Sequence, residues 1–278
     1  MIKVENLAFS YKRKQTLFQD FSYTLQSGGV YGLLGRNGAG KSTLLQLMAG
    51  LLIPARGNVR FHGVEVSKRL PSLMSELFFV PEEFELPSVR LSDYVRLMSG
   101  FYPRFSEADF RKYLSVFELS EDLHLGSLSM GQRKKVFISF AIATNTAVLL
   151  MDEPTNGLDI SGKRQFRKIM ASGIDENRTL MISTHQVRDV ERLLDRVAIL
   201  EGNRMLLDES VSTICDKLYF TEVEQRDVVQ DAIATMPSLR GSYVMLPNDE
   251  GRESDLNLEL LYEGALAHPE LISAMFQK

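Results

Sequence analysis

One segment of nine residues constrains the fold of this chain more than any other feature. Residues 35–43 read Gly-Arg-Asn-Gly-Ala-Gly-Lys-Ser-Thr and match the pattern G-x-x-x-x-G-K-[ST]. An apolar run typical of a strand, Val30–Leu34, precedes the segment, and a helix-prone run, Thr43–Met48, follows it. In this order the three pieces form a phosphate-binding loop, because backbone N–H groups and the helix start converge on negative charge. The alternative is a glycine-rich turn that binds nothing.

The residue types inside the loop suit a nucleoside triphosphate with Mg²⁺. Glycines let the backbone wrap closely around phosphate oxygens. Lys41 supplies a point charge for the β- and γ-phosphates, and Ser42 offers a hydroxyl to Mg²⁺. The expected nucleotide-binding residues of the loop are Gly35, Arg36, Asn37, Gly38, Ala39, Gly40, Lys41, Ser42 and Thr43.

A pair of carboxylates follows a second apolar run. Residues 147–151 read Ala-Val-Leu-Leu-Met, the pattern of a buried parallel strand, and Asp152 and Glu153 come next. Acidic residues also occur at strand ends without any function. Together with the loop, however, they favour nucleotide hydrolysis, with Asp152 near Mg²⁺ and Glu153 as the general base for an attacking water.

A third motif narrows the class of nucleotidase. Residues 128–132 read Leu-Ser-Met-Gly-Gln, and three basic residues follow them. The segment resembles the L-S-G-G-Q signature of the ATP-binding cassette (ABC) family. Ser129 is a typical N-cap for a helix over Gln132–Thr144, so a hydroxyl and bare amides would face a second anion site. Taken alone, the pentapeptide also describes an ordinary capped helix.

The resemblance implies a shared site. In the ABC family, ATP lies between the phosphate loop of one subunit and the signature of the other in a head-to-tail dimer. This chain departs from the family at Met130, where glycine is usual, but it keeps Ser129 and Gly131. We therefore expect nucleotide contacts from Ser129, Gly131 and Gln132 across a homodimer, or a heterodimer with another ABC ATPase subunit.

Other family positions follow in the expected order. Tyr11 occupies the place of an aromatic residue that stacks on adenine, although a core aromatic of an alternating strand is the competing interpretation. Residues 156–159, Asn-Gly-Leu-Asp, resemble the segment that touches the partner's site. His185 follows the apolar run Thr179–Ser183 and resembles the family's switch histidine, which would make it a catalytic residue with Glu153 and Lys41.

One position breaks the family pattern. Residues 80–83 read Val-Pro-Glu-Glu where the family has a glutamine that borders the Mg²⁺ site and links it to the membrane partner. The Glu82 carboxylate still accepts a hydrogen bond from metal-bound water, but it adds negative charge beside Asp152 and Glu153 and cannot donate. We expect Ser42, Asp152 and Glu82 around the metal.

Composition agrees with a cytoplasmic enzyme. The chain has 278 residues, 44% of them apolar, which suffices for one substantial core and a small appendage. A formal charge of −4 without a basic run disfavours direct nucleic-acid binding. The single Cys215 allows no internal disulfide. The sequence shows no signal-peptide pattern and no apolar run near the roughly 20 residues that span a bilayer.

Patterns along the chain predict its organisation. Alternating strands are expected at Ile2–Tyr11 and Thr16–Leu25, and helices dominate from about Ser88 to Leu125. The expected fold class is α/β, a P-loop NTPase of ABC type with a mixed sheet core, an antiparallel N-terminal β subdomain, a helical subdomain at about 85–145 and a small C-terminal α+β appendage. The expected domains are 1–214, the ABC ATPase, and 215–278, the appendage.

The appendage carries no recognisable catalytic pattern. Three strands are predicted there, at Tyr219–Glu224, Tyr243–Leu246 and Leu256–Tyr262, and a helix is predicted over Asp227–Met236. The charged run Asp249–Asp255 is expected to be a solvated loop.

The sequence thus predicts the ATP-binding and ATP-hydrolysing subunit of an ABC transporter, attached to the cytoplasmic face of the cell membrane through separate integral membrane subunits. One alternative is a soluble ABC ATPase acting on ribosomes or DNA. Such proteins carry two cassettes with a charged linker or a long coiled coil, and neither is present. Another alternative, a binding module with dead catalysis, conflicts with the intact set of Lys41, Asp152, Glu153 and His185.

Overall fold

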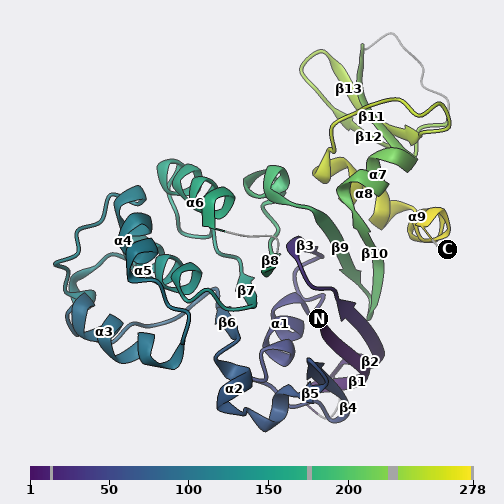
Figure 1. The fold of residues 1–278 in the computed structure, drawn as a ribbon. Coiled ribbons are helices and arrows are strands. Elements are labelled where there is room, and N and C mark those ends of the chain that lie inside the picture. Colours follow the sequence, from purple (N-terminus) through teal and green to yellow (C-terminus); the bar gives the residue numbers. More distant parts are fainter. Residues whose placement is uncertain (13–14, 174–176, 225–230, 277–278) are drawn as a thin grey trace.

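A six-stranded mixed sheet forms the centre of the molecule (Figure 1). The structure is a computed structural model that describes residues 1–12, 15–173, 177–224 and 231–276. The strand order is β10-β9-β3-β8-β7-β6, parallel throughout except for the antiparallel edge pair β9 and β10. The strands are β3 (Gly29–Leu34), β6 (Leu77–Val80), β7 (Val148–Asp152), β8 (Thr179–Ser183), β9 (Arg196–Glu201) and β10 (Arg204–Ser210).

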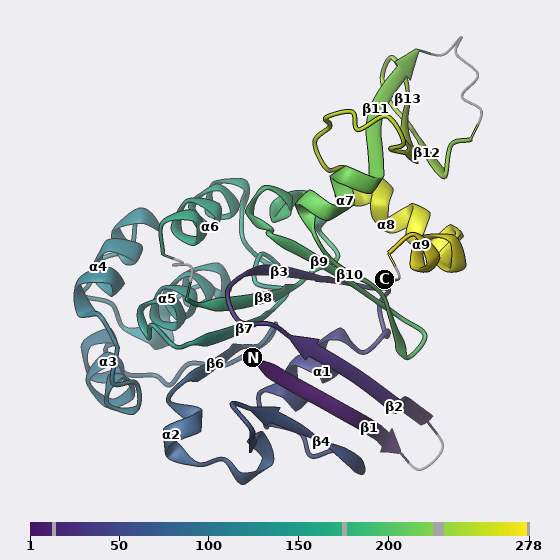
Figure 2. The same cartoon turned by 45° about the vertical axis from the view of Figure 1, so that its right-hand side comes forward.

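A second, antiparallel sheet holds the N-terminal part of the chain (Figure 2). Its order is β2-β1-β4-β5, with β1 at Ile2–Lys12, β2 at Gln15–Leu25, β4 at Arg56–Phe61 and β5 at Val64–Glu65. Helix α1 (Lys41–Met48) lies between the two sheets, and its leucines are fully buried against both. The expected antiparallel N-terminal subdomain is thereby confirmed.

Helices gather on the side of the central sheet away from the N-terminal strands (Figure 1). They are α3 (Leu91–Met98), α4 (Glu107–Val116), α5 (Met130–Ala143) and α6 (Ile160–Gly173). The short helix α2 (Pro71–Met74) precedes β6 and packs on the side of the N-terminal strands. Short 3-10 helices connect the elements at Val66–Lys68, Ser99–Phe101, Leu125–Ser127, Val187–Asp189 and Glu191–Leu193. The expected helical subdomain is present, and Phe140 of α5 packs against Tyr94 of α3 and Phe110 of α4.

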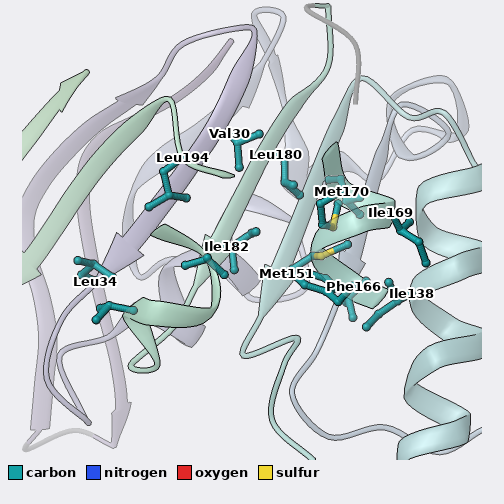
Figure 3. Close-up of a cluster of buried hydrophobic side chains, with 14 of the residues drawn as sticks. Val30, Leu34, Ile138, Met151, Phe166, Ile169, Met170, Leu180, Ile182 and Leu194 are labelled. Carbon is teal, nitrogen blue, oxygen red and sulfur yellow. The ribbon is translucent and has the colours of Figure 1, made fainter. Parts of the chain in front are cut away.

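The main core fills the space between the central sheet and these helices. Figure 3 shows Met151 of β7 beside Phe166 and Met170 of α6, while Leu34 of β3 lies on the side of Leu194. The strands are apolar on both faces, as strands covered on both sides require. The labelled core residues are Val30, Leu34, Ile138, Met151, Phe166, Ile169, Met170, Leu180, Ile182 and Leu194.

The C-terminal part is an α+β unit that extends from the edge of the central sheet (Figure 2). Its sheet has the order β11-β13-β12. The elements are α7 (Val211–Lys217), β11 (Leu218–Glu224), β12 (Ala234–Pro237), β13 (Gly241–Pro247), α8 (Leu258–Ala267) and α9 (Pro269–Phe276). Apolar residues of this unit join the same core as the central sheet, through contacts of α8 and α9 with β9 and β10.

Two predictions for the C-terminal part are wrong. The expected strand Leu256–Tyr262 is the start of helix α8, because Asn257 accepts a hydrogen bond from Leu260 N at 3.0 Å and caps the helix. The expected helix Asp227–Met236 falls partly outside the described residues, and its end lies in β12, where Ala234–Pro237 pairs with β13.

The order of the sheet positions the sequence motifs. Strands β3, β8 and β7 are neighbours, and they run parallel, so their carboxyl ends lie at one edge of the sheet. Residues 35–43 follow β3, Asp152 ends β7, and His185 comes just after β8. Ligands of open α/β sheets bind at this edge.

Candidate functional site

A cavity of about 460 Å³ opens at the carboxyl edge of the central sheet. It brings together segments that are far apart in the sequence, including the phosphate loop, β1 and the end of β7. The residues that line it are Tyr11, Leu17, Asn37, Gly38, Gly40, Lys41, Ser42, Thr43, Glu82, Glu153 and His185. Most of the residues expected to touch the nucleotide or the metal are therefore neighbours in space.

The loop backbone requires glycine at two positions. Gly40 has φ of 104° and caps α1, and a Cβ there would lie 2.7 Å from Phe18 Cζ. A Cβ at Gly35 would lie 2.4 Å from the backbone oxygen of Leu200. The first turn of α1 thus opens into the cavity with bare amide groups, which is the geometry that favours an anion.

Lys41 is held inside the loop. Its side chain is buried, and Nζ donates hydrogen bonds to the backbone oxygens of Gly35, at 2.7 Å, and Arg36, at 3.2 Å. Burial lowers the pKa of Lys41, and the carboxylates of Glu153 and Asp152 oppose that shift. The loop therefore holds a partly desolvated ammonium group that an incoming phosphate would stabilise.

Glu153 and His185 form a close pair. Glu153 Oε1 lies 2.7 Å from His185 Nδ1 and also accepts the His185 backbone N–H at 3.0 Å. The Glu153 side chain is 7% exposed, and its Oε2 is a buried oxygen for which no hydrogen bond is recorded among the described residues. An unpartnered buried carboxylate oxygen beside a cavity is suited to accept a proton from a bound water.

Asp152 lies behind the cavity wall. Its carboxylate is buried and accepts a hydrogen bond from the hydroxyl of Ser183, which ends β8. Within the described residues, no group of three or more His, Cys, Asp or Glu is arranged to hold a metal by itself. A metal here would take protein ligands from few oxygens, and Mg²⁺ in phosphate sites normally takes the rest from phosphate and water.

Glu82 faces the cavity from the segment after β6. Its Oε1 accepts a hydrogen bond from Asn156 Nδ2 at 2.8 Å. The other side of the Asn156 amide, Oδ1, accepts a bond from Gln186 Nε2 at 2.7 Å. One amide therefore connects the segment of Glu82 with the segment that follows His185.

Tyr11 is an exposed aromatic residue at the cavity mouth. Its ring is 61% exposed, so the alternative that Tyr11 is a core residue of the strand is wrong. The hydroxyl lies 2.9 Å from Thr43 Oγ1, and the Phe9 ring packs edge-on against Tyr11 with centroids 5.0 Å apart. These contacts hold a flat apolar surface next to the loop.

The signature residues lie outside this cavity. Ser129 caps α5 with a full capping box, in which Ser129 Oγ accepts from Gln132 N and Gln132 Oε1 accepts from Ser129 N. Ser129 and Gln132 are exposed, and Gly131 is half-buried. The N-cap prediction is confirmed, while Ser129, Gly131 and Gln132 do not line the cavity of the phosphate loop in the same chain.

The sequence interpretation missed Lys134 and Gln186, which the structure brings to the site, and it assigned Asn156 only to the segment expected to touch the partner's site. Lys134 is buried beneath the loop after Glu153, and Asn156 and Gln186 form the hydrogen-bond chain to Glu82. The three consecutive basic residues after the signature were the available signal for Lys134. For Gln186, no local pattern distinguishes it from a surface residue.

Comparison with known proteins agrees with this geometry. The family model described as ABC transporter matches residues 18–156. The ABC transporter ATP-binding protein YtrB of Bacillus subtilis (strain 168) is 29% identical over 74% of this chain and 70% of its own length. The methionine import ATP-binding protein MetN of Carboxydothermus hydrogenoformans is 34% identical over 77% of this chain and 67% of its own.

Solved structures show the same fold. The structure of an ATP-binding subunit of an ABC transporter aligns with a TM-score of 0.64 at 26% identity. The alignment covers 77% of this chain and 91% of the other one.

Proposed function

This chain belongs to the ABC transporter family as an ATP-binding subunit that hydrolyses ATP, and from that membership we propose how its residues share the work. The observation that carries the proposal is the single cavity in which Lys41, the loop amides and the unpartnered oxygen of Glu153 meet. In it, a triphosphate would lie between the positive loop and the general base.

ATP is bound through its phosphates and its base. The amides of residues 35–43 and the Lys41 ammonium bind the β- and γ-phosphates, because the amides donate hydrogen bonds and the ammonium is positive and already partly desolvated. Tyr11 stacks on adenine, since its exposed ring stands beside Thr43 at the mouth of the cavity.

Mg²⁺ would be held by oxygen ligands of the same site. Ser42 at the start of α1 would offer its hydroxyl to the ion, and the carboxylates of Asp152 and Glu82 would accept hydrogen bonds from its water ligands. These are hard oxygen donors, and they fit Mg²⁺ better than a softer metal. The ion supplies charge neutralisation for the transferred phosphoryl group.

Glu153 is the general base, and His185 orients it. The Nδ1 contact with Glu153 Oε1 fixes one carboxylate oxygen and leaves Oε2 to receive the proton of the attacking water. Because Nδ1 of His185 is taken up by Glu153, the other ring nitrogen, Nε2, is left to form a hydrogen bond with the γ-phosphate. Lys41, Glu153 and His185 are thus the proposed catalytic residues.

The active site is completed by a second subunit. Ser129, Gly131 and Gln132 present an exposed helix start that lies outside the cavity of their own chain, and such a start attracts anions. We assign these residues to the ATP bound by the phosphate loop of a partner ATPase. The partner is a second copy of this chain or another ABC ATPase subunit.

Separate integral membrane subunits carry the transported substrate. No described helix is long and apolar enough to cross a membrane. The chain is therefore proposed to act at the cytoplasmic face of the cell membrane, as a peripheral partner, with residues 1–214 as the ATPase domain and 215–278 as an accessory region. Direct binding to nucleic acid is not part of the proposal, because the chain has a formal charge of −4.

Co-purification tests this assignment. An affinity-tagged chain is expressed in its source cells, extracted from membranes in mild detergent and isolated. We expect an integral membrane protein in stoichiometric amount, and we expect reconstitution with it to stimulate ATP hydrolysis. Recovery from the soluble fraction alone, bound to ribosomes or DNA, would instead support the competing class of soluble ABC ATPases.

A further inference from the structure

Lys134 is a buried lysine that the function proposed above does not use. Its side chain is 5% exposed, and Nζ donates hydrogen bonds to the backbone oxygens of Glu153, at 3.0 Å, and Asn156, at 2.9 Å. Lysine is almost never fully buried without a compensating charge. Both of these bonded oxygens belong to neutral carbonyl groups, so carboxylates further away have to supply that charge.

Glu82 is a carboxylate that borders the surroundings of Lys134. Both residues line a second cavity, of about 590 Å³, together with Glu83 and Asn156. Burial lowers the pKa of Lys134, and among the carboxylates that oppose this shift Glu82 acts most strongly, ahead of Glu153 and Asp152. The residue that departs from the family pattern and the buried lysine therefore line the same cavity.

Asn156 connects the two residues through hydrogen bonds. Its backbone oxygen accepts from Lys134 Nζ, and its side-chain Nδ2 donates to Glu82 Oε1. A carboxylate can only accept, so it uses the donor side of this amide and leaves Oδ1 for Gln186. The segments carrying Glu82, Glu153, His185 and the signature helix meet at Asn156.

The backbone of Glu153 needs support, because its conformation is unusual. Glu153 has φ of 45°, a left-handed conformation that residues other than glycine rarely adopt. Hydrogen bonds hold the residue on both sides: its N–H donates to Ser183 O at 3.0 Å, and its carbonyl accepts from Lys134. Strained backbone persists where surrounding contacts fix it, and Lys134 is one of those contacts.

We propose that Lys134 is a positioning residue for hydrolysis, which fixes the backbone from Glu153 to Asn156 and compensates the carboxylate that Glu82 places where the family has glutamine. The inference rests on the proposed role of Glu153 as the base. Because Lys134 does not line the ATP cavity, it acts on turnover and not on ATP affinity.

An unfolding experiment without nucleotide tests the charge pair. Urea midpoints are measured for the wild type, Lys134→Met, Glu82→Gln and the double variant. Methionine keeps the length of the lysine stem, and glutamine at 82 keeps an oxygen that accepts from Asn156. We expect Lys134→Met to lower the midpoint less when Glu82→Gln is also present. Equal losses in both backgrounds would show that the two charges do not interact.

A kinetic cycle tests the positioning role. We expect Lys134→Met to lower kcat about tenfold while KM for ATP changes less than about twofold, since a charged hydrogen-bond donor to the backbone of the base is lost. Adding Glu82→Gln should recover about threefold of kcat. A rise in KM at unchanged kcat, or no recovery, overturns the proposal.

Neighbouring residues supply matched controls. Glu83→Gln removes the carboxylate next to Glu82. Of the four carboxylates that raise the Lys134 pKa, Glu83 has the weakest effect, so this substitution should not raise the kcat of Lys134→Met. Lys135→Met removes the next lysine of α5, which bonds to Gln165 Oε1 at 3.2 Å, and should leave the dependence on Glu82 unchanged. If Lys134→Met does not fold, Lys134→Gln, which keeps an amide donor, replaces it in both cycles.

The two experiments separate this inference from the proposed function. Full turnover in Glu153→Gln would reject Glu153 as the base, while the urea cycle would still decide whether Lys134 and Glu82 compensate each other. If the urea midpoints show that Lys134 and Glu82 are coupled but Lys134→Met does not change kcat, Lys134 is a structural residue and the positioning role is rejected.

Discussion

Glu153 combines several demands in one residue. It is buried, it has a positive φ, one of its carboxylate oxygens is shared with His185, and the other has no recorded partner among the described residues. The burial of a carboxylate, the positive φ and the unpaired oxygen each cost stability, and such costs concentrate at functional sites. The accumulation at a single side chain is a physical reason to place the chemistry there.

Replacing Glu153 tests its role as the base. We expect Glu153→Gln to keep ATP affinity, because the phosphate loop is untouched, and to lower turnover by about 10² to 10⁴, the usual contribution of a general base. Steady-state hydrolysis and equilibrium binding of a fluorescent ATP analogue measure the two quantities. Near-normal turnover would mean that another group activates the water.

At the residue scale, the sequence predicted the groups that belong to continuous motifs. Lys41 and Glu153 each lie in a short segment whose residue types specify phosphate and proton chemistry. Lys134 and Gln186 could not be assigned in this way, since their roles depend on which separate segments meet. Contacts between distant segments leave no local pattern in one sequence.

At the scale of elements, the hairpin β9–β10 contains a half-buried carboxyl group, that of Asp208. Asp208 lies 3.6 Å from Arg196, yet burial raises the Asp208 pKa by more than Arg196 lowers it. The neighbouring Tyr23 hydroxyl is also buried without a recorded hydrogen bond among the described residues. Relative to the unfolded chain, folding therefore shifts the equilibrium of the Asp208 carboxyl towards its neutral form.

Asp208→Asn should stabilise the chain in a pH-dependent way. A carboxyl group with a raised pKa in the folded state contributes stability below its ordinary value of 3.8, and this contribution is lost as pH rises through the folded pKa. Asparagine does not ionise, so the variant should melt higher than the wild type at pH 7, and the difference should shrink towards pH 4.

Thermal unfolding at both pH values checks this prediction, with the exposed Asp249→Asn as control. A lower melting temperature of Asp208→Asn at pH 7 would show that the ion pair with Arg196 outweighs the cost of burial.

Element types were predictable where the pattern extends over many residues. The alternation in β1 and β2 and the apolar runs of β7 and β8 have the periods that the structure shows. The segment at Leu256 failed because leucines at 256, 258 and 260 imitate a strand, whereas the Asn257 cap and the adjacent buried Leu261 select a helix. The helix cap at Asn257 therefore decided the secondary structure of this segment over the short alternation of leucines.

At the scale of the whole molecule, the described residues include two sequence motifs with helix starts suited to anions, and the cavity of the phosphate loop takes in one of them. The N-terminus of α1 opens into the cavity with Lys41, and the N-terminus of α5, capped by Ser129, lies outside it. A symmetric pair of chains related head to tail would bring each α5 start to the other chain's loop. This arrangement gives the exposed signature a function.

Mixing two inactive variants tests the shared site. Lys41→Ala disables the loop and Ser129→Arg blocks the signature, so each variant alone should lose nearly all ATPase activity. In a random one-to-one mixture, about one site in four combines an intact loop with an intact signature, and activity should return to that extent at most. A mixture no more active than its components would contradict sites built from two chains.

The most direct test of the account is the mass of Glu153→Gln in solution with and without ATP, measured by light scattering after gel filtration. If ATP joins two chains and Glu153 is needed to release them by hydrolysis, the variant should be monomeric without nucleotide and dimeric with ATP, and Ser129→Arg should abolish that dimer. A monomer at saturating ATP, together with a wild-type rate per chain that does not depend on protein concentration, would contradict the account.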